Sequence, residues 1–598
     1  MKDVTDSIKS SNKTKNWKKI KAIKKSLLKN IRWLYLILFI ILAIYYYIIL
    51  PPIHYASIDF WLFLLIASVG IILVELLADG FNFFKGNHNN KSFRSIRVSP
   101  KYKGIIQAWL LIFVLGTISY GVLSPFLFSK KYSQMITYET ANFKENFPET
   151  NVNQIPLVDR DTAERLGNRH LGALTDLVSQ FEAASDYTQI NIKGYPYRIT
   201  PLEYADFFRW LNNFREGIPH YIQVDNVTGE VEIKTPEKPI KYSYSDKFNR
   251  NIMRHLRFRY PFTLFENPTF EVDDEGVPYY IATTYTRNFL IREPEVAGVI
   301  TVNAMTGETE KYELDSIPTW IDRVYSAKLI MHQLKMNGLY KNGYWNSLFA
   351  KKGVTEPSEG YNYLPMKDDL YLYTGITSVA ADDSNIGFML VNMRTKETEF
   401  YPLTAAEEFS AMRSAEGSVQ ETEYQATFPL LINIKGRPMY ILTLKDNSGL
   451  IKAYALVDVQ NYQRVYVEAT LEKLLQKYSE EFEVDTEEIE ALSDLKMLEG
   501  KIEDIQATVV EGQTVYYFMV DGTIYKAPIS LSDQLPFIKQ NDSIQFSVND
   551  KLEVKEIELK KKSSSDDKEE KDEQDSENEE VESDKNVESI NESSSEQE

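Results

Sequence analysis

Three long apolar runs dominate the first 130 residues of the chain. They cover 33–50, 59–79 and 105–128, and the only charge well inside any of them is Glu75. An α-helix rises about 1.5 Å per residue, so roughly 20 apolar residues cross the hydrocarbon core of a bilayer. The pattern predicts an α-helical membrane anchor of three transmembrane helices over 33–128.

The charges that flank these runs indicate how the anchor is oriented. The leader 1–32 holds eleven Lys and Arg against two Asp, and the loop 80–104 holds six Lys and Arg and no acid, whereas 51–58 has neither Lys nor Arg. Basic flanks stay on the cytoplasmic side. We therefore expect a multi-pass plasma-membrane protein with a basic cytoplasmic leader and with everything after residue 128 extracytoplasmic. The first run is too long for the apolar core of a cleaved signal peptide.

Beyond residue 150 the pattern changes to alternating strands, and one piece recurs. A hydrophobic strand ends in Val-Asp or Val-Asn, then comes a polar turn and a second strand, at 221–233, 299–314, 388–403 and, in degenerate form, 454–467. The side chains of Asp225, Asn303 and Asn392 can bond their own turn backbone, and Gly229 and Gly307 accept a positive φ. In the third copy Lys396 replaces the glycine, so we expect a strained or different turn there.

Helices separate these hairpins and divide the region into modules. The pattern predicts helices at 203–214, from Pro318 to a stop at Gly338, and at 404–417 with a stop at Gly417. We expect α+β modules over 150–315 and 316–468, then a helical connector over 469–498.

The hairpins resemble the second hairpin of PepSY-type domains, over 10–15 residues in each copy. More broadly, the layout of three spans followed by segments such as 161–182, 373–392 and 414–434 is similar to that of uncharacterised multi-span membrane proteins of low-GC Gram-positive bacteria with PepSY-like extracytoplasmic repeats. The resemblance implies an architecture and a location in the cell envelope, and it carries no activity.

The C-terminal part divides into two segments of different character. Short strands joined by Gly512, Asp521-Gly522 and Asn541-Asp542 turns over 499–558 predict a small β-barrel of the OB or SH3 kind. The last segment, 561–598, has 16 Asp and Glu against 5 Lys and almost no large apolar side chain. Such a composition predicts a disordered acidic tail.

The composition of the chain excludes several kinds of chemical site. The 598 residues include no Cys and six His, and the formal net charge is -19, which excludes disulfides, thiolate metal sites and thiol nucleophiles and argues against nucleic-acid binding. No nucleotide-binding, hydrolase or EF-hand motif occurs, so we expect no cofactor, no bound metal and no catalytic residue. Acidic pairs such as Asp273-Asp274 and Asp382-Asp383 lie beside turn residues, where Asp is expected for backbone reasons.

One basic cluster interrupts the acidic exterior. Its members are Arg250, Arg254, His255, Arg257 and Arg259. Arg forks can grip phosphate or carboxylate, for example on an anionic wall polymer, although pairing with the module's own acids is the simpler interpretation.

These features favour a non-enzymatic, membrane-anchored binding or scaffolding protein of the Gram-positive cell envelope. Its expected partners are the bilayer and other envelope proteins or an anionic wall polymer. Two alternatives remain open. One is an accessory membrane subunit of a translocation or conjugation assembly, and the other is a regulator of a wall-modifying enzyme or protease.

Overall fold

The computed structural model describes residues 32–86, 100–122, 124–149, 154–287, 293–366, 368–379, 381–482, 496–510, 513–532, 534–548 and 552–559. Nearly all of the basic leader and the whole acidic tail 561–598 lie outside these residues. The protein forms two compact units, Met1–Leu492 and Ser493–Glu598, and each is described by itself.

Three apolar helices open the first unit, as the sequence predicts. They are Arg32–Ile49, α2 (Ile58–Gly86) and α3 (Pro100–Val122), and each has the length and apolar composition needed to cross a membrane. The third helix stops at Val122 instead of running to residue 128. Pro125 begins a separate helix, α4 (Pro125–Ser133), with Ser124 at its N-cap position, because proline fits the first turn of a helix and breaks its interior.

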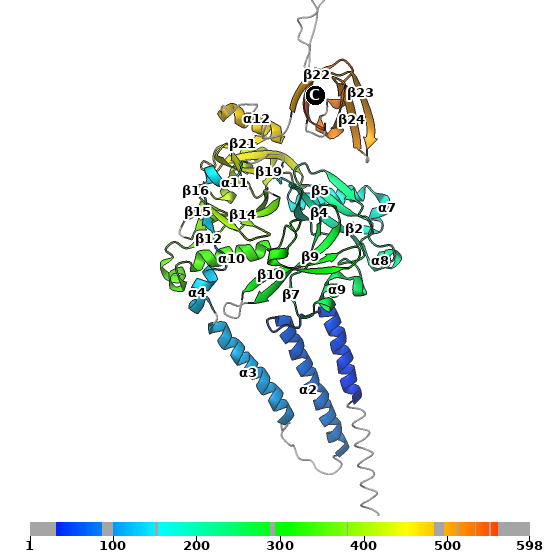
Figure 1. The fold of residues 1–598 in the computed structure, drawn as a ribbon, viewed down its shortest axis with the longest axis vertical. Helices are drawn as coiled ribbons and strands as arrows, with labels where there is room; N and C mark the ends of the chain where they lie inside the picture. Colours follow the sequence, from blue (N-terminus) through cyan, green and yellow to red (C-terminus); the bar gives the residue numbers. More distant parts are fainter. Residues whose placement is uncertain are drawn as a thin grey trace, which may run out of the picture. The chain divides into compact units, whose positions relative to one another are not determined.

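A fourfold repeat builds the β-rich body of this unit. Each repeat is a helix followed by a sheet whose first strand is broken in two and whose last three strands form an antiparallel meander. Figure 1 shows the sheets coloured in chain order, from blue-green for the first to yellow for the fourth. The first repeat comprises α6 (Arg160–Gly172), β2 (Phe181–Ala183), β3 (Thr188–Ile192), β4 (Tyr195–Tyr204), β5 (Tyr221–Asp225) and β6 (Val231–Lys234). The second comprises α9 (Ile252–Arg259), β7 (Leu264–Phe265), β8 (Thr269–Val272), β9 (Pro278–Arg287), β10 (Pro294–Asn303) and β11 (Thr309–Glu313).

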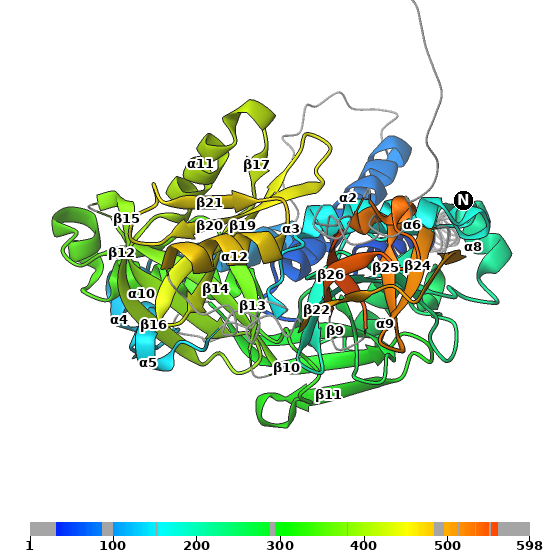
Figure 2. The ribbon, with the colours of Figure 1, turned by 90° about the horizontal axis from the view of Figure 1, so that it is seen from above.

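The other two repeats follow the same order. The third comprises α10 (Ala327–Tyr340), β12 (Thr355–Pro357), β13 (Asn362–Met366), β14 (Asp369–Ser378), β15 (Ala381–Asn392) and β16 (Thr398–Ala406). The fourth comprises α11 (Glu408–Ser418), β17 (Gln425–Ala426), β18 (Leu430–Ile434), β19 (Arg437–Lys445), β20 (Ile451–Asp458) and β21 (Val465–Glu468). A further helix, α12 (Leu471–Phe482), packs with α11 against β20 and β21 (Figure 2).

Shorter elements lie before and within the first repeat. They are β1 (Glu139–Thr140), which pairs in parallel with β16, and the helices α5 (Phe143–Asn146), α7 (Thr175–Val178) and α8 (Phe207–Asn213). The helix predicted over 203–214 is therefore shorter at its start, because β4 continues to Tyr204 and Asp206 caps α8 by accepting the backbone N–H groups of Phe208 and Arg209.

The turn between the second and third strands of each meander is the most regular feature of the repeat. A carboxylate or amide oxygen accepts the backbone N–H groups two and three residues ahead in every copy, from Asp225, Asn303, Asn392 and Asp458. In the first three copies the fourth residue after it has a left-handed φ, at Gly229, Gly307 and Lys396. The third turn is thus of the same type, and the strain falls on Lys396, whose Nζ donates to Met135 O at 2.6 Å.

Removing one of these turn acceptors should weaken its repeat measurably. Asn303→Ala leaves the Met305 and Thr306 backbone N–H groups without the acceptor they have at 3.0 Å, and we expect the free energy of unfolding to fall by about 1 kcal/mol. Urea unfolding of the full chain in detergent micelles measures the change. Asn303→Asp keeps an acceptor at the same place and should stay within about 0.5 kcal/mol of the parent.

Helix α10 differs from its predicted extent at both ends. It begins at Ala327 after Ser326, nine residues beyond Pro318, and runs through Gly338 to Tyr340. Gly338 is not a stop: a Cβ there would lie 2.1 Å from the Thr355 carbonyl oxygen, so the glycine lets α10 approach β12 closely. Gly417 likewise lies inside α11.

Three hydrophobic cores join the four sheets in sequence. One holds buried residues of the first and second sheets, another those of the second and third, and another those of the third and fourth. The fourth sheet returns to the first repeat through an ion pair of Lys445 with Asp159 at 2.6 Å. The four repeats therefore form a closed ring of contacts, and residue 315, where one α+β region was expected to end, lies between β11 of the second repeat and α10 of the third.

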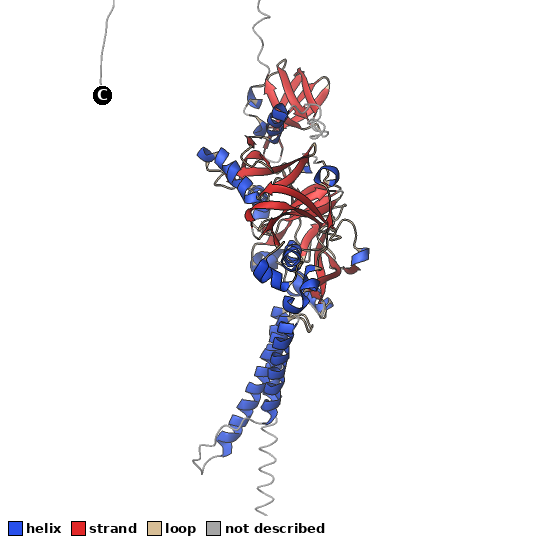
Figure 3. Ribbon diagram, turned by 90° about the vertical axis from the view of Figure 1, so that its left-hand side faces the viewer, coloured by secondary structure: helices blue, strands red, loops and turns tan. Residues whose placement is uncertain are grey.

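The second unit consists of two three-stranded antiparallel sheets around one core. One sheet contains β22 (Lys496–Lys501), β26 (Ser543–Val548) and β27 (Val554–Leu559), and the other contains β23 (Asp504–Val510), β24 (Gln513–Val520) and β25 (Thr523–Pro528). The rings of Phe518, Tyr525 and Phe546 contact one another inside it. Figure 3 shows its strands in red.

Candidate functional site

The candidate site is a cavity of about 340 Å³ in the first unit. Its wall includes residues of β3 and β4 in the first repeat, β13 in the third, and β18 and β19 in the fourth. Its charged lining residues are Asp159, Arg160, Asp161, Asp186, Arg198 and Arg323, and its aromatic ones are Tyr187, Tyr361, Tyr363 and Phe428. A place where three repeats meet is where a ring of sheets can hold a ligand between rigid elements.

Arg198 is the most deeply buried charge of the cavity. Its guanidinium donates to four neutral oxygens, namely Val158 O at 3.0 Å, Asn226 Oδ1 at 3.1 Å, Gln189 Oε1 at 3.0 Å and Tyr187 O at 3.4 Å. Burial lowers the pKa of Arg198 to about 10, and the Asp159 charge opposes that shift. The arginine therefore supplies positive potential that no hydrogen-bonded carboxylate cancels within the described residues.

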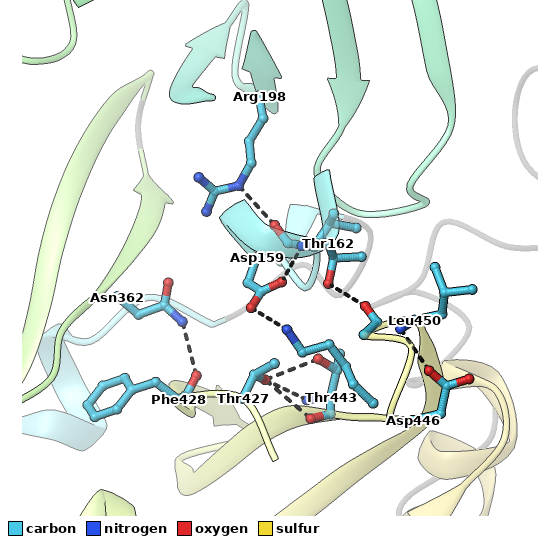
Figure 4. A network of polar contacts seen from close by, with 12 residues as sticks. Asp159, Thr162, Arg198, Asn362, Thr427, Phe428, Thr443, Asp446 and Leu450 are labelled. Carbon is cyan, nitrogen blue, oxygen red and sulfur yellow. Dashed lines mark hydrogen bonds and ion pairs between the residues drawn. The ribbon is translucent and has the colours of Figure 1, made fainter. Parts of the chain in front are cut away.

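Asp159, at the start of α6 in the first repeat, forms an ion pair with a lysine of the fourth repeat (Figure 4). One oxygen caps α6 by accepting the Thr162 backbone N–H at 3.0 Å, and the other accepts Lys445 Nζ at 2.6 Å. Burial alone would raise the pKa of Asp159, but the hydrogen bonds from Lys445 and Thr162 and the Lys445 charge outweigh it and hold the pKa below its ordinary value. Its charge is thus already neutralised by Lys445.

Arg323 provides the second arginine that a ligand could reach. Its Nη2 lies 3.5 Å from Tyr363 Oη and its guanidinium 5.6 Å from the centre of that ring. Arg160 reaches Ser185 O at 2.9 Å from an exposed position. Asp161 and Asp186 stand among these arginines, so the site suits a polar ligand that brings its own acidic group and a hydrogen-bond donor.

A larger depression, about 650 Å³, lies over Thr140–Lys144 and Gly436–Pro438. Its charged lining residues are Lys144 and Arg437, both exposed. Exposed cations bind less specifically than a buried arginine fixed by four oxygens. We therefore regard the smaller cavity as the better candidate.

The basic cluster predicted from the sequence lies in α9 and just before it. Its members contact different partners. Arg250 donates to Phe214 O, Arg254 to Phe248 O, and Arg257 to Thr263 O. His255 Nε2 lies 2.8 Å from Gly307 O, and Arg259 is exposed. Arg257 also lies 4.0 Å from the centre of the Phe265 ring, so backbone carbonyls and aromatic rings, more than acids, occupy these cations.

Sequence reasoning missed Arg198, although a comparison of the repeats carries the signal. The residue before each turn acceptor is Val224, Val302, Val391 or Val457, and these pair across the sheet with Arg198, Tyr280, Leu372 and Tyr440. All four partners are buried. This position therefore carries a charged side chain in the first copy, whereas it is aromatic or aliphatic in the other three.

Comparisons with known proteins add no family to this picture. No family model matches the chain, and no curated protein matches it. Among solved structures, an ACO/RPE65 chimera aligns at 8% identity with a TM-score of 0.12, over 46% of this chain and 46% of that chain. The Nup133 β-propeller domain of Vanderwaltozyma polyspora aligns at 8% identity with a TM-score of 0.14, over 64% of this chain and 92% of that chain. This chain thus spans less than half of the chimera, and neither TM-score is high enough to infer a related fold.

Proposed function

We propose that the protein is a non-enzymatic, membrane-anchored binding protein of the cell envelope, with its β-rich body on the extracytoplasmic side. The observation that carries the proposal is the cavity, in which Arg198 is held by neutral oxygens only and Arg323 and Arg160 stand nearby. The proposed ligand is an anionic envelope component, such as a phosphate-bearing wall polymer, whose acidic group would meet these arginines. The proposed PepSY-like character of the repeats fits a module that binds rather than reacts.

Two observations support the orientation. The sequence that precedes the first span and the loop before the third are basic, which favours their retention inside. The loop between the first two spans touches the β-rich body, because the Ile53 backbone N–H donates to Pro261 O at 2.8 Å. That contact supports a topology in which the loop and the body share one side of the membrane, as three spans would give; the basic flanks are what favour the extracytoplasmic side.

Binding should depend on the cavity arginines. With the full chain in lipid nanodiscs and a glycerol phosphate oligomer as probe, we expect Arg323→Gln to weaken binding about tenfold, which corresponds to about 1.4 kcal/mol for one lost charge-assisted bond. Isothermal titration calorimetry measures the affinity. Arg215→Gln, an exposed arginine outside the cavity lining, is the matched control and should bind as the parent does. Equal affinity of both variants, or no binding by the parent, would overturn the proposed ligand class.

The orientation has a separate test. Protease treatment of intact, wall-stripped cells should digest the second unit and spare a tag on the N-terminus. Protection of both would place the body in the cytoplasm and end the envelope proposal.

A further inference from the structure

Two surface segments of the β-rich body carry large apolar side chains that are each more than half exposed. One is the end of α9 and the turn after it, with Phe258 and Phe262. The other is the helical segment Asn346–Ala350 and the residue before it, with Trp345, Leu348 and Phe349. Phe262 is 67% exposed and Phe349 is 76% exposed. We call these five residues the aromatic surface. Aromatic and aliphatic groups gathered in this way are costly to leave in water.

Both segments contact residues at the end of a membrane helix or just beyond it. The Phe258 ring lies 6.2 Å from Tyr46 and 6.1 Å from Tyr47, which belong to the last turn of the first span. The Trp345 ring lies 5.6 Å from Phe126 in α4, four residues beyond the end of α3. The aromatic surface therefore continues the apolar surface of the anchor at two separate points, and Figure 1 places α9 and α4 at the same ends of the helices.

Cationic side chains accompany the aromatic surface. Lys351 and Lys352 follow Phe349 and are exposed, and the exposed Arg259 follows Phe258. Arg254 lies 4.2 Å from the centre of the Tyr47 ring. Aromatic rings and basic side chains together are typical of the boundary between lipid tails and headgroups, where rings enter the acyl region and cations meet phosphate.

We propose that the aromatic surface inserts into the interfacial layer of the bilayer and so docks the body against the membrane at two points beside the spans. Lipid is the occupant because the surface is continuous with helices that lipid already surrounds. The proposal depends on the three-span anchor and not on the orientation of the protein, so it holds on whichever side of the membrane the body lies. Docking at two points would fix the tilt of the body and hence the direction in which its cavity faces.

The absence of Cys makes a site-specific test direct. Phe349→Cys and Phe262→Cys are each labelled with an environment-sensitive fluorophore in the full chain, reconstituted in phosphatidylcholine and phosphatidylglycerol vesicles. The vesicles also contain lipids with a nitroxide near the top of the acyl chain, which quench nearby fluorophores. Both positions are largely exposed, so the substitutions remove little packing. Tyr462→Cys, in the turn between β20 and β21, is the matched control at an exposed aromatic.

We expect at least twofold quenching by the nitroxide lipids at residues 349 and 262, with emission shifted to shorter wavelength, and no quenching at residue 462. Absence of quenching at both loop positions would overturn the proposal, and would direct attention to a protein partner for this surface. Equal quenching at all three positions would also overturn it, because contact with lipid would then not be a property of the aromatic surface.

Discussion

Replacing Arg198 by methionine is expected to lower the free energy of unfolding of the first unit by about 3 kcal/mol, because the change leaves several buried oxygen acceptors without a hydrogen-bond donor. The guanidinium satisfies oxygens from the segment before α6, from β3 and from the turn after β5. Methionine has a similar volume but no donor. Urea unfolding of the full chain in nanodiscs, followed by tryptophan fluorescence, measures the loss.

The matched control is Arg160→Met, which removes an exposed arginine from the same cavity and should cost less than about 1 kcal/mol. Arg160 donates to one carbonyl, Ser185 O. If both variants lose the same small amount, the acceptors around Arg198 must be satisfied by water, and Arg198 is then dispensable for folding. A large loss for Arg198→Met alone means that the arginine is part of the scaffold of the cavity as well as a source of its positive potential.

The parts of the fold that the sequence predicts well depend on local chemistry. Three apolar runs become three helices, since length and composition decide whether a segment can cross a bilayer. The turn residues Asp225, Asn303 and Asn392 bond their own backbone, because a short acceptor two residues from an N–H group needs no tertiary partner.

The parts that the sequence leaves open depend on contacts between distant residues. Gly338 reads as a helix stop, but its role is to admit Thr355 of β12. The break in each first strand, as between β2 and β3 along β4, has no pattern that a short window can detect. The closure of the ring joins Asp159 to Lys445 across nearly 290 residues, and nothing local encodes that pairing.

The candidate site is the clearest case of this difference. The sequence directs attention to the dense basic run Arg250–Arg259, whose members bind backbone and rings near α9. The cavity instead draws single residues from separate repeats, such as Arg198 from β4 and Tyr363 from β13. Only an alignment of the repeats on their turn acceptors would have exposed Arg198, by contrast with Tyr280, Leu372 and Tyr440.

A second large effect is expected from Glu271 in β8, which is fully buried beside the junction of the second and third repeats. One of its oxygens accepts Thr269 Oγ1 at 3.2 Å, while the other has no hydrogen-bond partner among the described residues. Burial raises the pKa of Glu271 to about 7, and the Arg323 charge opposes the shift. Burial also raises the pKa of the neighbouring Asp322, and the Glu271 charge adds to it.

The sign of the stability change follows from the raised pKa. The native chain keeps a proton that the unfolded chain releases near pH 4.5, so the contribution of Glu271 is complete below that pH and is lost as the pH rises towards 7. Glu271→Gln cannot ionise. We therefore expect the variant to exceed the parent in free energy of unfolding by about 3 kcal/mol at pH 8, and to lie within about 1 kcal/mol of it at pH 4.5.

Urea unfolding of both chains at the two pH values measures this difference. Glu275→Gln, which changes an exposed acid in the turn after β8, should leave the pH dependence of the parent unaltered. A gain for Glu271→Gln that is the same at pH 4.5 and pH 8 would mean that packing and not charge decides it. A gain confined to pH 8 would show that the protein tolerates a buried acid at the junction of its repeats, next to the arginine that lines the cavity, at a cost to its own stability.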